Sequence, residues 1–265
     1  MEAIKLAGLE PASVFGYFEK LCTMPHGSGN TKIISDYLVS FAKEQNIPYI
    51  QDELNNVILF APASVGFEDH EPVIIQGHMD MVCEKDADCP INFETDGLDI
   101  THDGSYVFAR GTTLGGDDGI AVAYALALIA DRSIPHPPLE VIITVDEETG
   151  MYGAAGIDLS MLKGRKLLNI DSEEEGVFTV ACAGGARASI TLPVSRHAVY
   201  GPCVKLVVDG LAGGHSGVEI DKGRANANKI MGEFTVSQKL NSKIFNVSQM
   251  SFLFILLLLC FFVII

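Results

Sequence analysis

Two residues that could bind a metal ion, His78 and Asp80, come directly after the apolar run 72–77. Such a run is typical of a buried strand. Because side chains alternate across a strand, both residues are expected to project to the same side if the extended backbone continues past Gly77. A neutral imidazole binds metals, and a neighbouring carboxylate can fix the orientation of its ring. The pair also fits a polar turn after a core strand, so it does not decide the chemistry by itself.

Carboxylates occupy three further positions where a strand is predicted to end or a helix to begin. They are Asp117 and Asp118 before the apolar helical run 120–130, Asp146, Glu147 and Glu148 after the β-branched strand 139–145, and Asp171 after the apolar strand 167–170. Helix capping would explain one aspartate of the first pair, and a solvated turn would explain the acidic triplet. A phosphate-binding loop is disfavoured, because no Lys-Ser/Thr follows the glycines.

Considered together, these positions predict one crevice with a metal site. In open α/β sheets, groups that follow the carboxyl ends of the strands converge. Like charges brought together there would raise each other's pKa unless a cation held them. One imidazole with several carboxylates suits Zn, Mn or Co, and the oxygens suffice for two ions. Paired ions supply hydroxide at neutral pH and polarise a carbonyl, which is the chemistry of amide hydrolysis.

The elements that must position these residues can be predicted from hydrophobic spacing and turn residues. Helices are predicted over 9–22, over 30–44 with Asn30 as the cap, and from 226, and strands over 56–60 and 73–76. The turn-rich stretch 83–110 predicts a surface excursion with hairpin turns at Asp96-Gly97 and Asp103-Gly104. After Gly176, the segments 177–183, 188–192 and 204–210 predict an antiparallel sheet in a second domain.

Composition narrows the class of partner and the compartment. The 265 residues include 18 Lys and Arg against 34 Asp and Glu, a formal net charge of −16. This charge disfavours nucleic acid and anionic membrane surfaces as partners. The six cysteines are scattered without a Cys-x-x-Cys pair, and the first residues do not have the pattern of a secretory signal. We therefore expect reduced thiols and a cytoplasmic location.

Five motifs occur in a fixed order, and together they resemble one family. They are GHMD at 77–80, GTTLGGDDG at 111–119, DEETGM at 146–151, DSEEEG at 171–176 and GGHSG at 213–217. The sequence from about Leu9 to Gly232 resembles the peptidase D-like aminoacyl-histidine dipeptidases, the cytosolic non-specific dipeptidases among the co-catalytic zinc metallopeptidases. The resemblance implies an α/β catalytic domain of the zinc aminopeptidase type, with a mixed sheet flanked by helices, followed by an α+β lid domain. It also implies hydrolysis of small unblocked dipeptides, including Xaa-His.

The resemblance implies two zinc ions and their ligands. His78 and Asp171 would be terminal ligands of one ion, Asp117 would bridge both ions, and Glu148 would hold the second. Full-length relatives supply a last histidine to the second ion, which this chain lacks after His215. We therefore expect one firmly bound zinc and a weak or absent second ion.

Three further residues receive catalytic roles from the same resemblance. Asp80 would orient His78, and Glu147 would be the general base that takes a proton from the attacking water. His215, a lid residue that often acts across a homodimer in the relatives, would stabilise the oxyanion.

The resemblance also divides the chain and exposes an ambiguity at its end. Residues 1–185 would form a catalytic metallopeptidase domain that lacks its C-terminal part, and 186–233 would begin a lid and dimerisation domain. Residues 234–265 are a divergent tail that ends in the apolar segment 251–265. Any contact with a membrane would be made through this segment only. The alternative to an active dipeptidase is an inactive truncated fragment or a membrane-attached pseudoenzyme.

Overall fold

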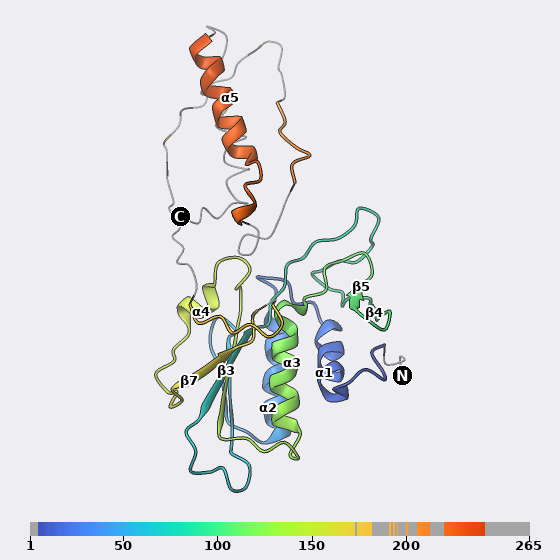
Figure 1. The fold of residues 1–265 in the computed structure, drawn as a ribbon, viewed down its shortest axis with the longest axis vertical. Helices are drawn as coiled ribbons and strands as arrows, with labels where there is room; N and C mark the ends of the chain where they lie inside the picture. The colour runs from blue at the N-terminus through green and yellow to red at the C-terminus, as the bar shows by residue number, and fades with distance from the viewer. Residues whose placement is uncertain are drawn as a thin grey trace. The chain divides into compact units, whose positions relative to one another are not determined.

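A five-stranded mixed sheet is the framework of the first part of the chain in the computed structural model (Figure 1). Its strands are, in spatial order, β1 (Tyr49–Gln51), β2 (Val57–Ala61), β6 (Leu139–Thr144), β3 (Val73–His78) and β7 (Lys166–Asn169). β2 is antiparallel to β1 and β6, whereas β3 is parallel to β6 and β7. The carboxyl ends of β3, β6 and β7 therefore share one edge of the sheet.

The structure describes residues 5–172, 174–181, 191, 193, 195, 200, 206–212 and 220–241, with the backbone alone for 235–241. The chain divides into two compact units, residues 1–177 and 178–265. The sheet and the helices that pack on it belong to the first unit.

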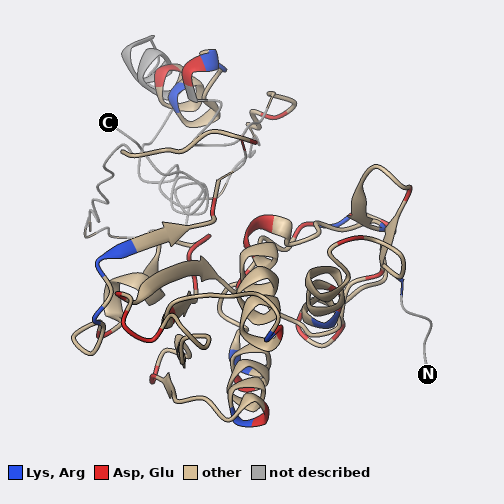
Figure 2. Cartoon of the chain, turned by 60° about the horizontal axis from the view of Figure 1, so that its bottom comes forward, with Lys and Arg blue, Asp and Glu red and all other residues tan. Residues whose placement is uncertain are grey.

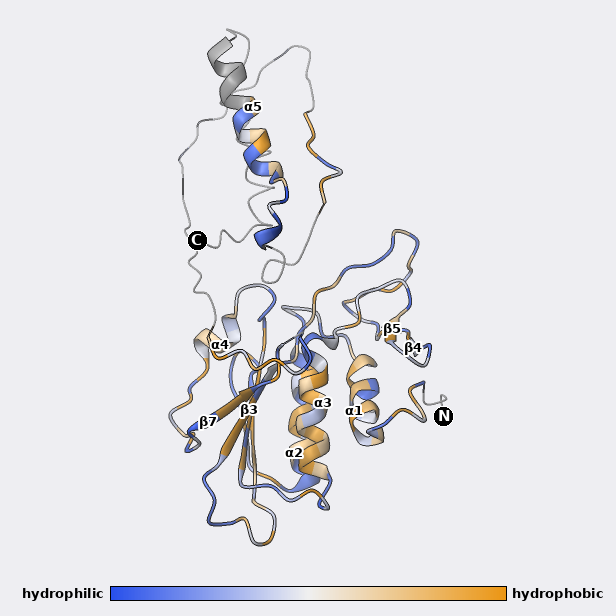
Figure 3. Cartoon of the chain, viewed as in Figure 1, coloured by the Kyte–Doolittle hydropathy of each residue, from blue (hydrophilic) through white to orange (hydrophobic). Residues whose placement is uncertain are grey.

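Two helices pack on the sheet and a third packs on one of them, because each has apolar residues to bury. They are α1 (Ala12–Cys22), α2 (Lys32–Gln45) and α3 (Gly116–Ala130). Helix α3 is rich in alanine and leucine and packs between α1 and β3, whereas α2 contacts β1 and β2. Figure 3 shows α3, β3 and β7 largely in the orange of apolar residues. The core contains Phe18, Leu38, Leu59, Leu126 and Ile143, each at most 2 % exposed. The predicted α/β class with a mixed sheet is confirmed.

Two predicted helix starts differ from the structure by a few residues. Helix α1 begins at Ala12, so that Pro11 precedes the helix instead of lying in its first turn. Thr31, not Asn30, is the residue before α2. The Asn30 amide donates to the backbone carbonyls of Phe93 and Glu94, at 3.5 and 3.2 Å, and so holds the surface excursion.

The excursion contains one hairpin, made of β4 (Ile100–His102) and β5 (Val107–Ala109). Its turn contains Asp103-Gly104 as predicted, and the Asp103 carboxylate accepts the backbone N–H groups of Ser105 and Tyr106. The second predicted hairpin turn is wrong, because Asp96-Gly97 does not join two paired strands.

The second unit contains two helical elements among its described residues, the 3₁₀ turn η1 (Ile220–Lys222) and α5 (Ala227–Asn241). The predicted helix from 226 is confirmed and continues to Asn241. No strand is assigned to 177–181 or 206–210, and the rest of the predicted second sheet lies outside the described residues. Among the residues that the structure describes, no helix has the length and apolar character needed to cross a membrane. The tail segment 251–265 is not among them.

Candidate functional site

His78 is the last residue of β3, and its side chain is 1 % exposed. Its ring Nδ1 lies 3.0 Å from the backbone carbonyl oxygen of Asp80 and 3.4 Å from Asp80 Oδ1. Since a carbonyl oxygen can only accept, Nδ1 carries a proton and donates it. This leaves Nε2 as the ring atom that can bind a metal ion. His78 and Asp80, which were expected on one side of the strand end, are neighbours in the structure.

Carboxylates from three different elements surround Nε2 of His78. Asp117 Oδ1 lies 3.0 Å away, Glu147 Oε2 3.9 Å and Asp171 Oδ2 4.0 Å. Asp117 lies in the first turn of α3, which is red in Figure 2, while Glu147 follows β6 and Asp171 follows β7. The sheet register explains the convergence, because His78 pairs with Thr144 and both precede the acidic loops at one edge.

Two groups of three residues have ligand atoms within 4.8 Å of one another. The first is His78, Asp117 and Glu148, and the second is His78, Asp118 and Asp171. All four predicted metal ligands thus lie around a single imidazole. The second group differs from the predicted ligand set, since Asp118 takes the place expected for Asp117.

Asp118 is a site residue to which the sequence assigned no role beyond helix capping. Its side chain is buried, and its Oδ2 accepts the backbone N–H of His78 at 3.1 Å. A Cβ added at Gly77 would lie 2.5 Å from that oxygen, so this contact requires glycine at the end of β3. Asp118 therefore joins the start of α3 to the strand that carries His78.

Asp80 has contacts beyond the imidazole of His78. Its buried carboxylate accepts the Ser28 hydroxyl at 2.7 Å and the backbone N–H groups of Glu147 and Glu148 at 3.1 and 3.4 Å. Burial would raise the pKa of Asp80, but the hydrogen bonds with His78, Ser28 and the Glu147 backbone hold that pKa below its ordinary value. One carboxylate thus connects the histidine to the acidic loop after β6.

The electrostatics of the cluster show an excess of negative charge. Burial would lower the pKa of His78, but hydrogen bonds with Asp117 and Asp80 raise it to about 11. Burial, followed by repulsion from neighbouring carboxylates, raises the pKa of Asp118 and of Glu148 to about 7 each. The pKa of Glu147 is raised for the same reasons. Acids that repel one another around a buried imidazole form a donor set that fits a divalent cation.

Asn56 holds the acidic loop after β6 in place, although the sequence pattern did not identify it as a site residue. This residue is 1 % exposed and precedes β2. Its Oδ1 accepts the backbone N–H of Val145 at 3.0 Å, and its Nδ2 donates to the carbonyl oxygen of Gly153 at 3.1 Å. Both ends of the segment that carries Glu147 and Glu148 are therefore fixed by one amide.

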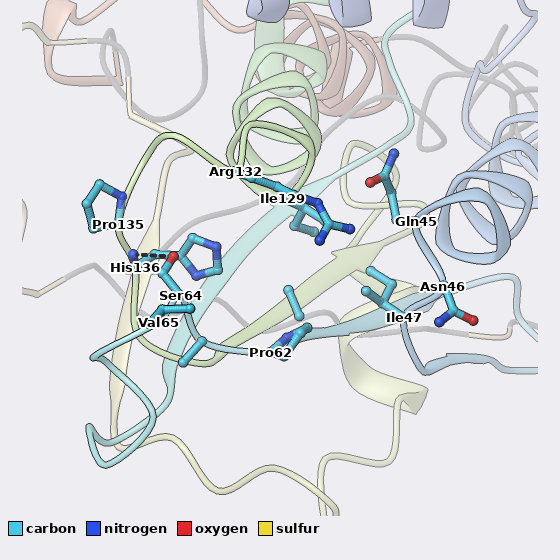
Figure 4. A pocket seen from close by; sticks show the side chains of 12 residues that line it. Gln45, Asn46, Ile47, Pro62, Ser64, Val65, Ile129, Arg132, Pro135 and His136 are labelled. Carbon is cyan, nitrogen blue, oxygen red and sulfur yellow. Dashed lines mark hydrogen bonds between the residues drawn. The ribbon is translucent and has the colours of Figure 1, made fainter.

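One predicted site residue is not among the described residues, and one cavity lies away from the cluster. The predicted oxyanion residue His215 lies outside the described residues. A cavity of about 560 Å³ lies at the opposite edge of the sheet and is lined by residues such as Asn46, Arg132 and His136 (Figure 4). Its lining includes Ala61, which pairs with Leu139, the first residue of β6. Glu147 and Glu148 come after the last residue of β6, at the other end of the strand. The cavity is therefore about 20 Å from the cluster, the length of a six-residue strand.

The sequence matches Peptidase family M20/M25/M40 over residues 74–227, more than half of the chain. The chain belongs to this peptidase family. The matched range contains the histidine and all the carboxylates of the cluster, whereas Ser28 and Asn56 come before it. The predicted enzyme class, a hydrolase that acts on peptide bonds, is the class of the family.

Individual M20 relatives agree with this assignment. The chain is 42 % identical to the cytosol non-specific dipeptidase of Escherichia coli (strain K12) over 232 residues, 87 % of this chain and 48 % of that protein. Its structure resembles the aminoacylhistidine dipeptidase from Vibrio alginolyticus with a TM-score of 0.67 and 38 % identity, over 86 % of this chain and 47 % of that one. A tripeptidase from Staphylococcus aureus, with a TM-score of 0.51 and 21 % identity over 61 % of this chain and 43 % of that one, shares the fold. The chain spans about half the length of these relatives.

Proposed function

We propose that this M20 chain is a metal-dependent dipeptidase that hydrolyses small unblocked peptides, including Xaa-His. The observation that carries the proposal is a buried imidazole whose Nε2 faces carboxylates from three elements at one sheet edge. The names of the two relatives, a non-specific dipeptidase and an aminoacylhistidine dipeptidase, support dipeptides as the substrate class.

The ligand atoms are proposed from the cluster. His78 Nε2, Asp117 and Asp171 would hold one ion, and Asp117 and Glu148 would hold a second, with zinc the ion that best suits this mixture of nitrogen and oxygen donors. A bound ion would polarise the peptide carbonyl and lower the pKa of water. Once His78 is assigned to the first ion, the second position keeps two carboxylates among the described residues, so we expect it to bind more weakly.

Glu147 is proposed as the general base. Its Oε2 lies 3.9 Å from His78 Nε2, its side chain is 32 % exposed, and it belongs to neither group of clustered ligand atoms. A carboxylate at this place can reach both the solvent and the reacting centre. Glu147 would accept a proton from the attacking water and pass it to the leaving amine.

The remaining proposals concern the rest of the molecule. Residues 1–185 would form the catalytic domain, 186–233 the beginning of a lid, and 234–265 a divergent tail. His215 would stabilise the substrate oxyanion within a homodimer. The name of the E. coli relative supports a cytoplasmic location. The strongly negative charge disfavours nucleic acid as a partner.

Metal analysis combined with a dipeptidase assay tests the proposal. The purified chain would be loaded with zinc, dialysed, measured by plasma mass spectrometry, and assayed for release of histidine from an Xaa-His dipeptide. We expect about one retained zinc and hydrolysis that stops on chelation. The variant His78→Ala should lose the ion, whereas Glu53→Gln, an exposed acid outside the cluster, should keep it.

The outcomes separate the possibilities. Hydrolysis that survives complete removal of metal would contradict the mechanism. Two tightly held ions would contradict the weak second site. A chain that binds zinc but hydrolyses no dipeptide would support the alternative hypothesis of a non-catalytic fragment. That hypothesis is motivated by the coverage of about half the length of the relatives.

A further inference from the structure

We infer that Ser28 is a positioning residue of the metal centre, which acts on His78 and on the Glu147 loop through the carboxylate of Asp80. Ser28 lies in the turn between α1 and α2, 52 residues from Asp80 in sequence. Its hydroxyl donates to Asp80 Oδ2 at 2.7 Å. The inference rests on the proposed function insofar as it takes the cluster to be a metal site.

The turn holds Ser28 in place through the backbone. Gly27 forms a parallel bridge with Met81, the Met81 N–H donates to the carbonyl of His26 at 3.2 Å, and the Ser28 N–H donates to the carbonyl of Met81 at 3.4 Å. The turn therefore runs beside the continuation of β3 like a short extra strand. Because the backbone is fixed on this side, the Ser28 hydroxyl is a donor that is already aimed at Asp80.

The same turn also contacts the loop after β6. The backbone N–H of Gly29 donates to Asp146 Oδ1 at 2.6 Å, one residue before Glu147. Residues 28 and 29 thus contact both the segment after β3, which contains Asp80, and the loop after β6, which carries Glu147 and Glu148. A change at Ser28 can reach both sides of the cluster.

The hydrogen bonds of Asp80 show why the hydroxyl matters. Oδ1 accepts the Glu147 N–H at 3.1 Å and lies 3.4 Å from His78 Nδ1. Oδ2 accepts the Ser28 hydroxyl at 2.7 Å and the Glu148 N–H at 3.4 Å. The bond from Ser28 is the shortest of the four contacts. Without it, Oδ2 would keep only the longest hydrogen bond, and the carboxylate could rotate away from both His78 and Glu147.

Water cannot replace the hydroxyl freely, because Asp80 is 1 % exposed. The loss of the hydroxyl should therefore free the Asp80 carboxylate and weaken its 3.4 Å contact with His78 Nδ1, which would keep only its 3.0 Å bond to the Asp80 backbone carbonyl. Outer partners of metal ligands typically contribute 10–100-fold to metal affinity. Ser28 acts one step further out than Asp80, so we expect the lower end of this range, about 10-fold.

A purely local role for Ser28 makes a different prediction. If the hydroxyl only stabilised the turn, its removal would lower the melting temperature and leave the affinity and geometry of the metal site unchanged. The test therefore needs a readout of the site itself. Co²⁺ supplies one, because its visible absorption reports the geometry of its ligands and can be titrated.

The experiment compares four full-length chains titrated with Co²⁺: wild type, Ser28→Ala, Ser28→Thr and Ser35→Ala. Threonine retains the hydroxyl and should restore binding. Ser35 is a matched control, because it is 0 % exposed and its hydroxyl donates to the carbonyl of Asn55 at 2.8 Å, outside the cluster. Circular dichroism and thermal melts of all four chains measure folding separately from binding.

We expect Ser28→Ala to bind Co²⁺ about 10-fold more weakly with an altered absorption band, and Ser28→Thr and Ser35→Ala to resemble wild type. Wild-type affinity and spectrum in Ser28→Ala would overturn the inference alone. An equal loss in Ser35→Ala would also overturn it, since the effect would then follow from any buried hydroxyl. A wild-type chain that gives no Co²⁺ spectrum would overturn the metal site and this inference together. If Ser28→Ala fails to fold, a weakened Ser28→Thr would overturn the inference and a normal one would support it.

Discussion

Glu147 and Glu148 are neighbours in sequence, but their surroundings predict different roles. Glu148 shares a group of clustered ligand atoms with His78 and Asp117, whereas Glu147 belongs to none. Asp80 holds the backbone N–H of both residues, so the two side chains leave one anchored segment. A ligand and a proton carrier can therefore lie side by side without exchanging functions.

The first prediction follows from this division at the residue scale. Glu147→Gln would remove the proposed proton acceptor but no proposed ligand, so we expect kcat to fall by about 10²–10⁴-fold while zinc content stays at the wild-type level. Dipeptide kinetics and metal analysis on the same preparation check both parts. Loss of zinc in Glu147→Gln would show that this residue is a ligand instead.

At the scale of elements, the contact between β3 and α3 leaves no room for a side chain at Gly77. A Cβ at Gly77 would lie 2.5 Å from Asp118 Oδ2 and 2.9 Å from the Cβ of Ala121. Gly77→Ala should therefore push α3 away and destabilise the protein by about 1–3 kcal/mol, the usual cost of overpacking. It should also weaken metal binding, because Asp118 would lose the N–H of His78.

A glycine in α1 provides the control for this substitution. Nothing lies within 4 Å of a Cβ added at Gly16, which is inside a helix. Gly16→Ala should stabilise the protein by about 0.5–1 kcal/mol, since alanine is the better helix former. Urea unfolding measures the change in the free energy of unfolding, which should fall in Gly77→Ala and rise in Gly16→Ala. Destabilisation of both to the same extent would contradict the explanation by a specific contact.

Strand β7 depends on a buried acid at its beginning. Glu140 in β6 is 5 % exposed, and its carboxylate accepts the backbone N–H groups of Lys163 at 2.9 Å and Gly164 at 2.9 Å, just before β7. In Glu140→Gln the side-chain NH₂ group would face the backbone N–H groups, and two donors cannot bond to each other. We therefore predict that the free energy of unfolding falls by about 1–3 kcal/mol. Asp171, at the other end of β7, should bind metal more weakly. Thermal melts and zinc titration check this, with Glu53→Gln as the exposed control.

The sequence predicted the elements better than the contacts between them. β3, β6 and α3 were found because their apolar patterns are local and strong, and the acids that follow them were found because they interrupt those patterns. Ser28 and Asn56 were missed, since each is an ordinary polar residue whose partner lies 52 or 89 residues away. Asp118 received no specific role from the sequence, because only the fold shows that its carboxylate meets the end of β3.

At the scale of the whole molecule, the metal should contribute to folding as well as to chemistry. The chain has a formal net charge of −16, and part of this charge is gathered around His78. An ion at 100 times its Kd stabilises a protein by about 2.7 kcal/mol, and each kcal/mol moves Tm by about 2–4 °C at this size. We therefore expect chelation to lower Tm by about 5–10 °C. His78→Ala should melt at the same temperature with or without chelator, and a similar shift in that variant would place the ion elsewhere.

Strand β7 has a consequence for how the purified protein behaves in concentrated solution. Among the described residues β7 pairs only with β3, and its adjacent residues Leu167 and Leu168 are 54 % and 52 % exposed. Since neighbours in a strand point to opposite faces, apolar surface is open on both sides of a sheet margin that can template another strand. We predict reversible self-association that grows with protein concentration in sedimentation velocity runs. Leu168→Lys should suppress this self-association through charge repulsion. An unchanged sedimentation profile in the variant would show that the self-association arises at another surface.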